Sequence, residues 1–232
     1  MTLQVRDIDT FYGTSHILRR VSLEMADREL FAVLGRNGAG KTTLLRSITG
    51  VNPPAAGSIL LDGTEIAKLK SHRRTWLGIS YVPQGREIIP DITVAENIYL
   101  ALLGKGRKAK AVPKFIFDYF PALKSLVRQK GGTLSGGQQQ QLAIARALVQ
   151  EPKLLLMDEP TEGLQPSVVE EIEPIIRRIP TERNCAVLLV EQNLDFVRAI
   201  TQKFAILDTG RIVASGNIGE LTSTVARQHL AM

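Results

Sequence analysis

The sequence predicts an α/β fold in which a mainly parallel sheet is covered by helices on both faces. Three observations predict it. Apolar runs of the length of one buried strand recur at residues 30–34, 154–158 and 185–191. Segments with helical periodicity lie between or beside these runs, for example at 42–48 and 168–179. Strands that alternate with helices are typical of parallel sheets, because a parallel pair needs a crossover connection.

The N-terminal part is expected to form short strands, which we assign to an antiparallel β subdomain. Before the buried run at 30–34, shorter apolar runs lie at 3–5, 17–18 and 21–23, and turn residues separate them. A further run at 58–63 ends in a tight turn at Asp-Gly. Turn residues between short apolar runs are the signature of strands.

From residue 85 to residue 150 the pattern becomes mainly helical. Thr93 and Glu96 have the spacing of a capping box, which predicts that a helix begins there. The aromatic and aliphatic residues of 115–126 predict one helix packed on a core, and a second helix is expected at 139–149.

These changes of pattern suggest how the chain is divided. We interpret residues 1–232 as a single nucleotide-binding domain, with a core formed by 1–84 and 151–232 and a helical lobe formed by 85–150. Within the lobe, the basic connector 105–114 is interpreted as a solvated loop rather than a binding patch.

The other elements are expected to alternate. In order, we predict a strand at 79–84, a strand at 154–158, a helix at 168–179, a strand at 185–191, a helix at 194–200 and a strand pair at 204–207 and 211–214.

The composition places few limits on function. A net charge of +6 is compatible with nucleic acid or an anionic membrane surface as a partner, but many proteins share this balance. No apolar run approaches the about 20 residues of a membrane-spanning helix, and residues 1–7 are too polar for a signal peptide. We therefore expect a cytosolic protein in which the single cysteine, Cys185, is a core residue.

One motif indicates a nucleotide. Residues 35–42 read Gly-Arg-Asn-Gly-Ala-Gly-Lys-Thr and fit the phosphate-loop pattern G-x-x-x-x-G-K-[ST], with a strand before it and a helix after it. The glycines let successive N–H groups point at one anion, and the helix adds its positive end. Lys41 is expected to reach the outer phosphates and Thr42 to bind Mg²⁺. We assign the triphosphate site to Gly35, Arg36, Asn37, Gly38, Ala39, Gly40, Lys41, Thr42 and Thr43.

Two carboxylates end the strand at 154–158. Strand C-termini converge on the ligand edge of a doubly wound sheet, so Asp158 and Glu159 should lie near the phosphate loop. Asp158 is placed to hold Mg²⁺, directly or through water, and Glu159 to activate a hydrolytic water. Two acids at a strand end can also be merely solvated, but a phosphate loop in the same chain favours the catalytic interpretation.

Four segments in this order resemble the nucleotide-binding subunit of an ABC transporter: Gly35–Thr42, Gln84, Leu134-Ser135-Gly136-Gly137-Gln138 and Leu154–Glu159. The Leu-Ser-Gly-Gly-Gln signature is the specific element, and the resemblance covers essentially the whole chain. It implies an ATPase with a RecA-like phosphate-loop core, with ATP and Mg²⁺ as cofactors.

The resemblance also implies roles for single residues. Tyr12 lies where an aromatic side chain stacks on adenine, and the less favoured alternative is a turn tyrosine. Gln84 matches the glutamine that touches Mg²⁺ and the attacking water. In the signature, Ser135 and Gly137 match residues that clasp the γ-phosphate held by the other subunit, and we assign ATP binding in trans to Ser135, Gly136, Gly137 and Gln138. This implies a head-to-tail dimer with two ATP molecules between the subunits.

Two positions depart from the family pattern. Gln192 stands where the switch histidine is expected; it can still donate a hydrogen bond to the γ-phosphate but cannot become cationic. We therefore expect Gln192 to take part in catalysis and the site on this chain's own loop to hydrolyse more slowly than its counterpart. Gln165 replaces an aspartate that is common at the subunit interface. Both favour an asymmetric pair, with a second, different ATPase as partner, rather than a stable homodimer.

Both departures resemble the second ATPase of branched-chain amino acid and amide importers. Residues 135–146 and 160–167 look most similar to the urea-transporting members of that branch. The resemblance implies an ATPase on the cytoplasmic face of the inner membrane, bound to integral permease subunits and served indirectly by a periplasmic binding protein. Urea or a short amide is then the expected cargo, but no residue of an ATPase touches the cargo.

Three alternatives remain open. The first keeps the role but changes the cargo to branched-chain amino acids, and the second makes the chain part of an exporter. The third is a soluble ABC ATPase that acts on nucleic acid, which the basic charge favours slightly. The segment between Lys41 and Ser135 lacks the heptads of the chromosome-organising relatives, and the chain carries one cassette rather than two, so we expect no nucleic-acid partner.

Overall fold

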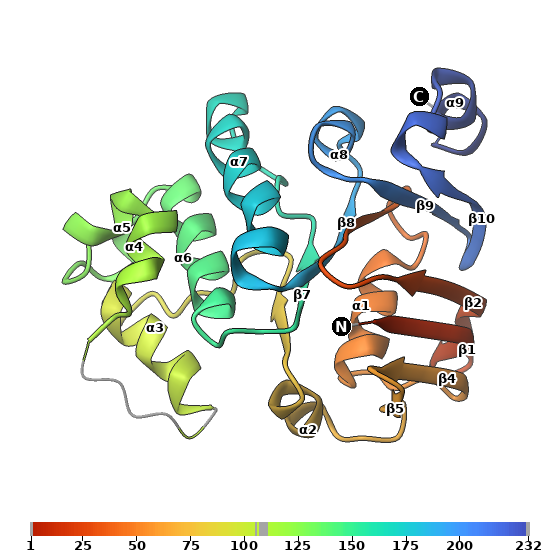
Figure 1. Ribbon diagram of the computed structural model, residues 1–232, viewed down its shortest axis with the longest axis horizontal. Helices are drawn as coiled ribbons and strands as arrows, with labels where there is room; N and C mark the ends of the chain where they lie inside the picture. Colours follow the sequence, from red (N-terminus) through yellow and green to blue (C-terminus); the bar gives the residue numbers. More distant parts are fainter. Residues whose placement is uncertain (1, 105, 107–110, 231–232) are drawn as a thin grey trace.

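The protein contains two sheets, one mostly parallel and one antiparallel. The computed structural model describes residues 2–104, 106 and 111–230. The larger sheet has six strands in the order β10-β9-β3-β8-β7-β6, and the smaller has four in the order β2-β1-β4-β5 (Figure 1). The expected α/β class, with a mainly parallel sheet and an antiparallel one, is confirmed.

All strands of the larger sheet run parallel except β10, which pairs antiparallel with β9. Its strands are β3 (Leu30–Leu34), β6 (Ile79–Val82), β7 (Leu154–Asp158), β8 (Ala186–Glu191), β9 (Lys203–Asp208) and β10 (Arg211–Asn217). Because β3, β7 and β8 are neighbours and point the same way, the loops that follow them leave the sheet at one edge.

The antiparallel sheet contains longer strands than the sequence predicts. It consists of β1 (Leu3–Tyr12), β2 (Ser15–Met25), β4 (Ala56–Leu61) and β5 (Thr64–Glu65). The apolar runs expected to be strands before residue 30 do lie in strands, but their lengths were wrong: 3–5 is the start of β1, and 17–18 and 21–23 belong to one continuous strand, β2. Irregular pairing interrupts their alternation, and Arg20 takes a left-handed backbone conformation with φ of 51°. Such irregularities break the period-2 pattern of a strand.

The central sheet is covered on both faces, and β3 shows why. Leu30, Ala32 and Leu34 face one hydrophobic cluster, while Phe31 and Val33 face another. The first cluster includes α7 (Pro166–Arg183), α8 (Leu194–Ile200) and α9 (Ser223–Leu230), and the second includes α1 (Lys41–Thr49) and the antiparallel sheet. Figure 1 shows α1 between the two sheets.

Between β6 and β7 the described residues form four α-helices, which pack on one another at the end of the molecule opposite the antiparallel sheet (Figure 1). They are α3 (Val94–Leu103), α4 (Lys114–Tyr119), α5 (Pro121–Ser125) and α6 (Gly136–Leu148), with a 3₁₀ turn at Gly131–Thr133. Thr93 caps α3 through the expected capping box. The division into a core and a helical lobe remains our interpretation of this arrangement.

Two of the helix predictions for this part were wrong in detail. The single helix expected at 115–126 is split at Phe120, because the residue before a proline is excluded from helical backbone angles and Pro121 follows. The helix expected at 139–149 begins three residues earlier, at Gly136, because Ser135 caps it. The connector 105–114 lies mostly outside the described residues.

Elsewhere the elements are longer than predicted, or were not predicted at all. Helix α7 extends beyond the expected 168–179 at both ends. Two helices were not expected, α2 (Ser71–Trp76) and α9, and a 3₁₀ turn occupies Ile218–Glu220. In the part of the chain that the structure describes, no helix combines the length and the hydropathy required to cross a bilayer.

The short helix α2 carries a buried arginine that holds the end of α1. Arg74 is completely buried and donates to four backbone carbonyls, those of Ser47 at 2.6 Å, Ile48 at 2.9 Å, Ala67 at 2.6 Å and Leu69 at 2.9 Å. Burial lowers the pKa of Arg74 to about 10, so the side chain stays charged at neutral pH. Two of these carbonyls belong to the last turn of α1, where a helix has no backbone donors of its own.

We expect Arg74→Met to lower the free energy of unfolding by at least about 3 kcal/mol, because several buried carbonyls lose their donors. Urea denaturation measures this. The matched control is Arg73→Met, which removes the exposed neighbour on the same helix and should change the stability by less than about 0.5 kcal/mol. Equal effects of the two substitutions would contradict the assigned role of Arg74.

Candidate nucleotide-binding site

The phosphate loop connects β3 to α1, and its backbone requires glycine at several positions. Gly38 and Gly40 have φ of +79° and +108°, in the left-handed region that glycine adopts readily. A Cβ at Gly35 would lie 2.5 Å from the carbonyl oxygen of Leu207 on β9. The loop therefore follows the path that the motif predicts, and it ends at the N-terminus of α1.

Lys41 lies at the centre of the site. The side chain is 4% exposed, and its Nζ donates to the carbonyls of Gly35 at 2.7 Å and Arg36 at 3.2 Å. The same nitrogen lies 2.9 Å from Oε1 of Glu159, which comes from the loop after β7. The lysine thus joins the loops that follow two different strands.

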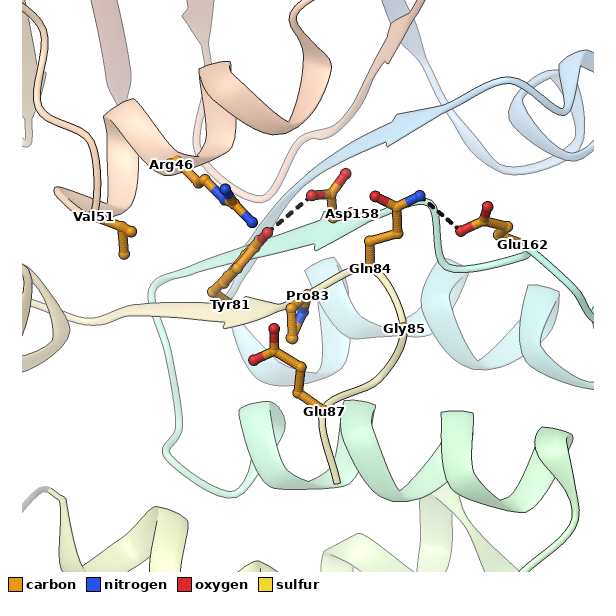
Figure 2. Close-up of a pocket in the computed structure, with 9 residues that line it drawn as sticks. All are labelled: Arg46, Val51, Tyr81, Pro83, Gln84, Gly85, Glu87, Asp158 and Glu162. Atoms are coloured by element: carbon orange, nitrogen blue, oxygen red, sulfur yellow. Dashed lines mark hydrogen bonds between the residues drawn. The ribbon is translucent and has the colours of Figure 1, made fainter. Parts of the chain in front are cut away.

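Asp158, the last residue of β7, is held at both carboxylate oxygens. Thr42 donates to Oδ1 at 3.1 Å, and the hydroxyl of Tyr81 on β6 donates to Oδ2 at 2.9 Å, as Figure 2 shows for the tyrosine. Burial raises the pKa of the Asp158 carboxyl above its usual range, while these two hydrogen bonds act in the opposite direction. Burial and the neighbouring Asp158 raise the pKa of the Tyr81 hydroxyl, which keeps it protonated as a donor.

Glu159 and Gln192 lie next to each other across the ends of β7 and β8. The amide nitrogen Nε2 of Gln192 lies 3.0 Å from each carboxylate oxygen of Glu159 and 2.8 Å from Oδ1 of Asn37 in the phosphate loop. Glu159 has φ of +46°, a strained conformation for a residue with a side chain. In this structure the amide N–H groups of Gln192 donate to Asn37 and Glu159, so neither is directed at a position for a phosphate.

Gln84 follows β6 and lines an open cavity of about 710 Å³ together with Tyr81, Asp158 and Glu162 (Figure 2). Its Nε2 donates to Oε2 of Glu162 at 2.9 Å. Figure 2 shows the Gln84 amide oxygen on the side of Asp158, where a carbonyl oxygen is a suitable ligand for Mg²⁺. The structure thus brings Thr42, Gln84 and Asp158 to the same part of the site.

Tyr12 lies at the end of β1 and is 44% exposed. Arg46 on α1 donates to its hydroxyl at 3.4 Å, so the tyrosine lies beside the helix that the phosphate loop begins. An exposed ring at this position is available for stacking, and its contact with adenine remains a prediction.

The signature residues do not join the phosphate loop of the same chain. Ser135 accepts from the backbone N–H of Gln138 at 3.3 Å, and the Gln138 side chain accepts from the N–H of Ser135 at 3.0 Å, so the pair forms the capping box of α6. Ser135 is exposed and lines neither of the cavities next to the phosphate loop and Asp158. Binding the γ-phosphate of another subunit requires an exposed helix N-terminus of this kind. That role of the signature remains a prediction.

Tyr81 is a functional candidate of this site that the sequence analysis missed. The only sequence signal is its position in the strand directly before Val82-Pro83-Gln84, since alternation along β6 directs it to one face. The hydroxyl's partner, Asp158, lies on β7, which pairs with β6 although the two residues are 77 positions apart in the sequence. No local pattern predicts that contact.

Comparison with known proteins identifies the family. A sequence profile described as ABC transporter matches residues 18–162, more than half of the chain. The chain belongs to the ABC transporter family. It is an ATP-binding cassette of the kind that hydrolyses ATP.

Two relatives and one solved structure are similar over nearly their whole length. The probable branched-chain amino acid transport ATP-binding protein LivF of Archaeoglobus fulgidus is 36% identical over 231 residues, covering 99% of this chain and 98% of the relative. The high-affinity branched-chain amino acid transport ATP-binding protein BraG of Pseudomonas aeruginosa is 39% identical over 208 residues, covering 89% and 88%. The dimeric post-hydrolysis structure of the ATP-binding cassette MJ0796 with ADP and Pi superimposes with a TM-score of 0.83 at 25% identity, covering 93% and 98%.

We expect Tyr81→Phe to raise the Mg²⁺ concentration for half-maximal ATP hydrolysis about tenfold, because Asp158, the predicted metal ligand, would lose an outer hydrogen bond and be less well oriented. A Mg²⁺ titration of the ATPase rate at saturating ATP measures this. Tyr99→Phe, on α3, is the matched control and should leave the titration unchanged. An unshifted titration in Tyr81→Phe would show that Asp158 does not need the hydroxyl.

Proposed function

We propose that this chain is the ATP-hydrolysing subunit of an ABC importer for branched-chain amino acids. One observation carries the ATPase role: Lys41, Asp158, Glu159 and Gln192 meet at the edge of the sheet where β3, β7 and β8 end. The import role and its cargo are supported by the names of the two relatives, LivF and BraG, which match this chain almost from end to end.

In this proposal Glu159 is the general base that activates the hydrolytic water. The carboxylate lies 2.9 Å from Nζ of Lys41 and 3.0 Å from Nε2 of Gln192, so a cation and an amide orient it. Lys41 neutralises charge on the outer phosphates, and Gln192 orients Glu159 and takes part in catalysis in this way. An amide cannot donate a proton as an acid, so Gln192 acts only by hydrogen bonds.

The residues present fit a Mg²⁺ ion. Thr42, Gln84 and Asp158 supply a hydroxyl, an amide and a carboxylate, which are the oxygen donors that Mg²⁺ prefers. Among the described residues no group of three or more His, Cys, Asp or Glu side chains forms a metal site. Few protein ligands are typical of Mg²⁺ sites in which the nucleotide's phosphates complete the coordination. When bound, the ion would neutralise charge on the phosphates.

We further propose that two cassettes pair head to tail, with Ser135–Gln138 of one subunit facing the phosphate loop of the other. The exposed N-terminus of α6 supports this, and so does the dimeric form reported for MJ0796. The partner is a second, different ATPase, because Gln165 and Gln192 depart from the family pattern. Permease subunits would hold the pair at the cytoplasmic face of the inner membrane, with a periplasmic binding protein supplying the cargo.

The cargo favoured here differs from the urea expected above. That expectation depends on the similarity of residues 135–146 and 160–167 to urea-transporting members. The names of the two relatives mention branched-chain amino acids and not urea, and their similarity extends over 231 and 208 residues. The longer comparison supports the alternative of branched-chain amino acids.

We expect Glu159→Gln to bind ATP as the parent protein does but to hydrolyse the ATP on this chain's own phosphate loop at least about a hundredfold more slowly in a single turnover, because the general base is lost. Nucleotide titration and rapid quench of the chain assembled with its partners measure the two steps. The control is Glu170→Gln, which makes the same change at an exposed carboxylate on α7. It should change neither ATP binding nor ATP hydrolysis. Full single-turnover hydrolysis at this chain's own site in Glu159→Gln would disprove the base assignment.

For the cargo, we expect leucine, isoleucine or valine to stimulate ATP hydrolysis by the reconstituted transporter in the presence of its binding protein. Urea and acetamide are the comparison solutes, at matched concentration. Stimulation by urea and not by leucine would restore the urea assignment and disprove the amino-acid one.

A further inference from the structure

The carboxylate of Glu191 lies buried beside the site and has no role in the chemistry proposed above. It ends β8 and is 3% exposed. Oε1 accepts from the backbone N–H of Thr161 at 3.0 Å and from its hydroxyl at 2.6 Å. Oε2 accepts from the backbone N–H groups of Gln192 at 2.8 Å and Asn193 at 3.0 Å.

These four hydrogen bonds connect two loops where the sheet can no longer do so. The pairing of β7 with β8 ends at Asp158 opposite Val190, and the N–H of Glu159 makes the last backbone contact, at 3.0 Å to the carbonyl of Val190. Beyond that point the two backbone segments diverge: one continues toward α7 and the other toward α8. The side chain of Glu191 replaces the missing backbone hydrogen bonds and joins Thr161 of one loop to Gln192 and Asn193 of the other.

The chemistry of this contact favours a carboxylate. Three of the four partners are backbone N–H groups, which can only donate, and they face both oxygens of Glu191, so each side of the group needs an acceptor. In Glu191→Gln the NH₂ group would face the backbone N–H of Thr161 in one orientation and those of Gln192 and Asn193 in the other, so at least one of the four hydrogen bonds would be lost. In Glu191→Asp the carboxylate would be one methylene shorter and could not reach both loops.

The contact also determines where the Gln192 side chain lies. The backbone of Gln192 is held on Oε2 of Glu191, and the next residue, Asn193, caps α8 by accepting from the N–H of Phe196 at 3.1 Å. With its backbone held on both sides, Gln192 directs Nε2 to the carboxylate of Glu159 at 3.0 Å. A shift of either loop would change that distance directly.

We propose that Glu191 is a positioning residue that fixes the loops after β7 and β8 to each other and thereby holds Gln192 against Glu159. The effect on turnover rests on the proposed role of Glu159 as general base, whereas the contact between the loops does not. The chain offers a matched comparison in Glu29. Glu29 is 9% exposed, accepts from the N–H of Ala26 at 2.7 Å and pairs with Lys203 at 2.8 Å, but it precedes β3 at the opposite edge of the sheet.

The first experiment tests the contact itself and needs no ATPase activity. Hydrogen exchange of the purified chain is compared for the parent, Glu191→Gln and Glu29→Gln. We expect Glu191→Gln to lose protection about tenfold on the side of the contact that the NH₂ group faces, which is either the N–H of Thr161 or the N–H groups of Gln192 and Asn193. Glu29→Gln should leave the protection of all three N–H groups unchanged. Unchanged protection in Glu191→Gln would overturn the proposal, whatever the ATPase does.

The second experiment tests the consequence for catalysis in the assembled transporter. We expect Glu191→Gln to lower kcat for hydrolysis at this chain's own site about tenfold with little change in KM for ATP, because a small displacement of a positioned group slows the reaction step. Glu29→Gln should lower the melting temperature but leave kcat unchanged. In a Gln192→Ala background the effect of Glu191→Gln should disappear, because the two residues act through one contact.

Two outcomes of the second experiment would overturn the proposal. One is a double variant whose loss of kcat equals the product of the losses caused by Glu191→Gln and by Gln192→Ala separately. The other is a rise in KM for ATP at constant kcat in Glu191→Gln. If Glu191→Gln fails to fold, Thr161→Val replaces it, because this substitution removes a single donor to Glu191. Thr161→Val should lower kcat by a smaller factor, and Thr161→Ser, which keeps the hydroxyl, should retain the parent kcat. The effect of Thr161→Val should also vanish in the Gln192→Ala background. Failure of the base assignment would instead show in Glu159→Gln, with hydrogen exchange unaffected.

Discussion

The parallel pairing of β3, β8 and β7 is the constraint on which the rest of the site depends. Parallel neighbours end at the same edge of a sheet, so the loops after residues 34, 158 and 191 must leave it within a few ångströms of one another. Each loop then contributes one kind of group: the phosphate loop brings Lys41, β7 brings its carboxylates and β8 brings Gln192. Segments more than a hundred residues apart in the sequence are brought together in this way without any local signal for it.

This edge of the sheet buries charge, which is costly unless each charge has partners. Lys41 and Glu159 are 4% and 8% exposed and pair with each other. The lysine also keeps two backbone carbonyls as acceptors, and the glutamate keeps the amide of Gln192 as a donor. Because neither group depends on the other alone, a phosphate can replace Glu159 as the anionic partner of Lys41 while Glu159 keeps its hydrogen bonds from Gln192.

The errors of the sequence analysis have identifiable physical causes. The helix expected at 115–126 had the right apolar residues, but Pro121 excludes helical angles at Phe120 and splits it. The start of α6 was placed too late because two glycines disfavour a helix, although Ser135 and Gln138 form the same capping box that correctly predicted α3. The short helix α2 is stabilised largely by Arg74, whose carbonyl partners lie on α1 and in the preceding loop, and a window of six residues contains none of that information.

What the sequence determined by itself is everything that depends on neighbours along the chain. The phosphate loop is of this kind, since its glycines, its lysine and the following helix lie within a few residues, and so are the buried strands and the order of the motifs. Only the tertiary structure decided which of these groups touch: that Tyr81 holds Asp158, that Gln192 donates to Glu159 and Asn37, and that Glu191 joins two loops. The physical reason is that hydrogen bonds act over about 3 Å in space, whereas the order of strands in the sheet, which brings these groups that close, is not written in any single segment of the chain.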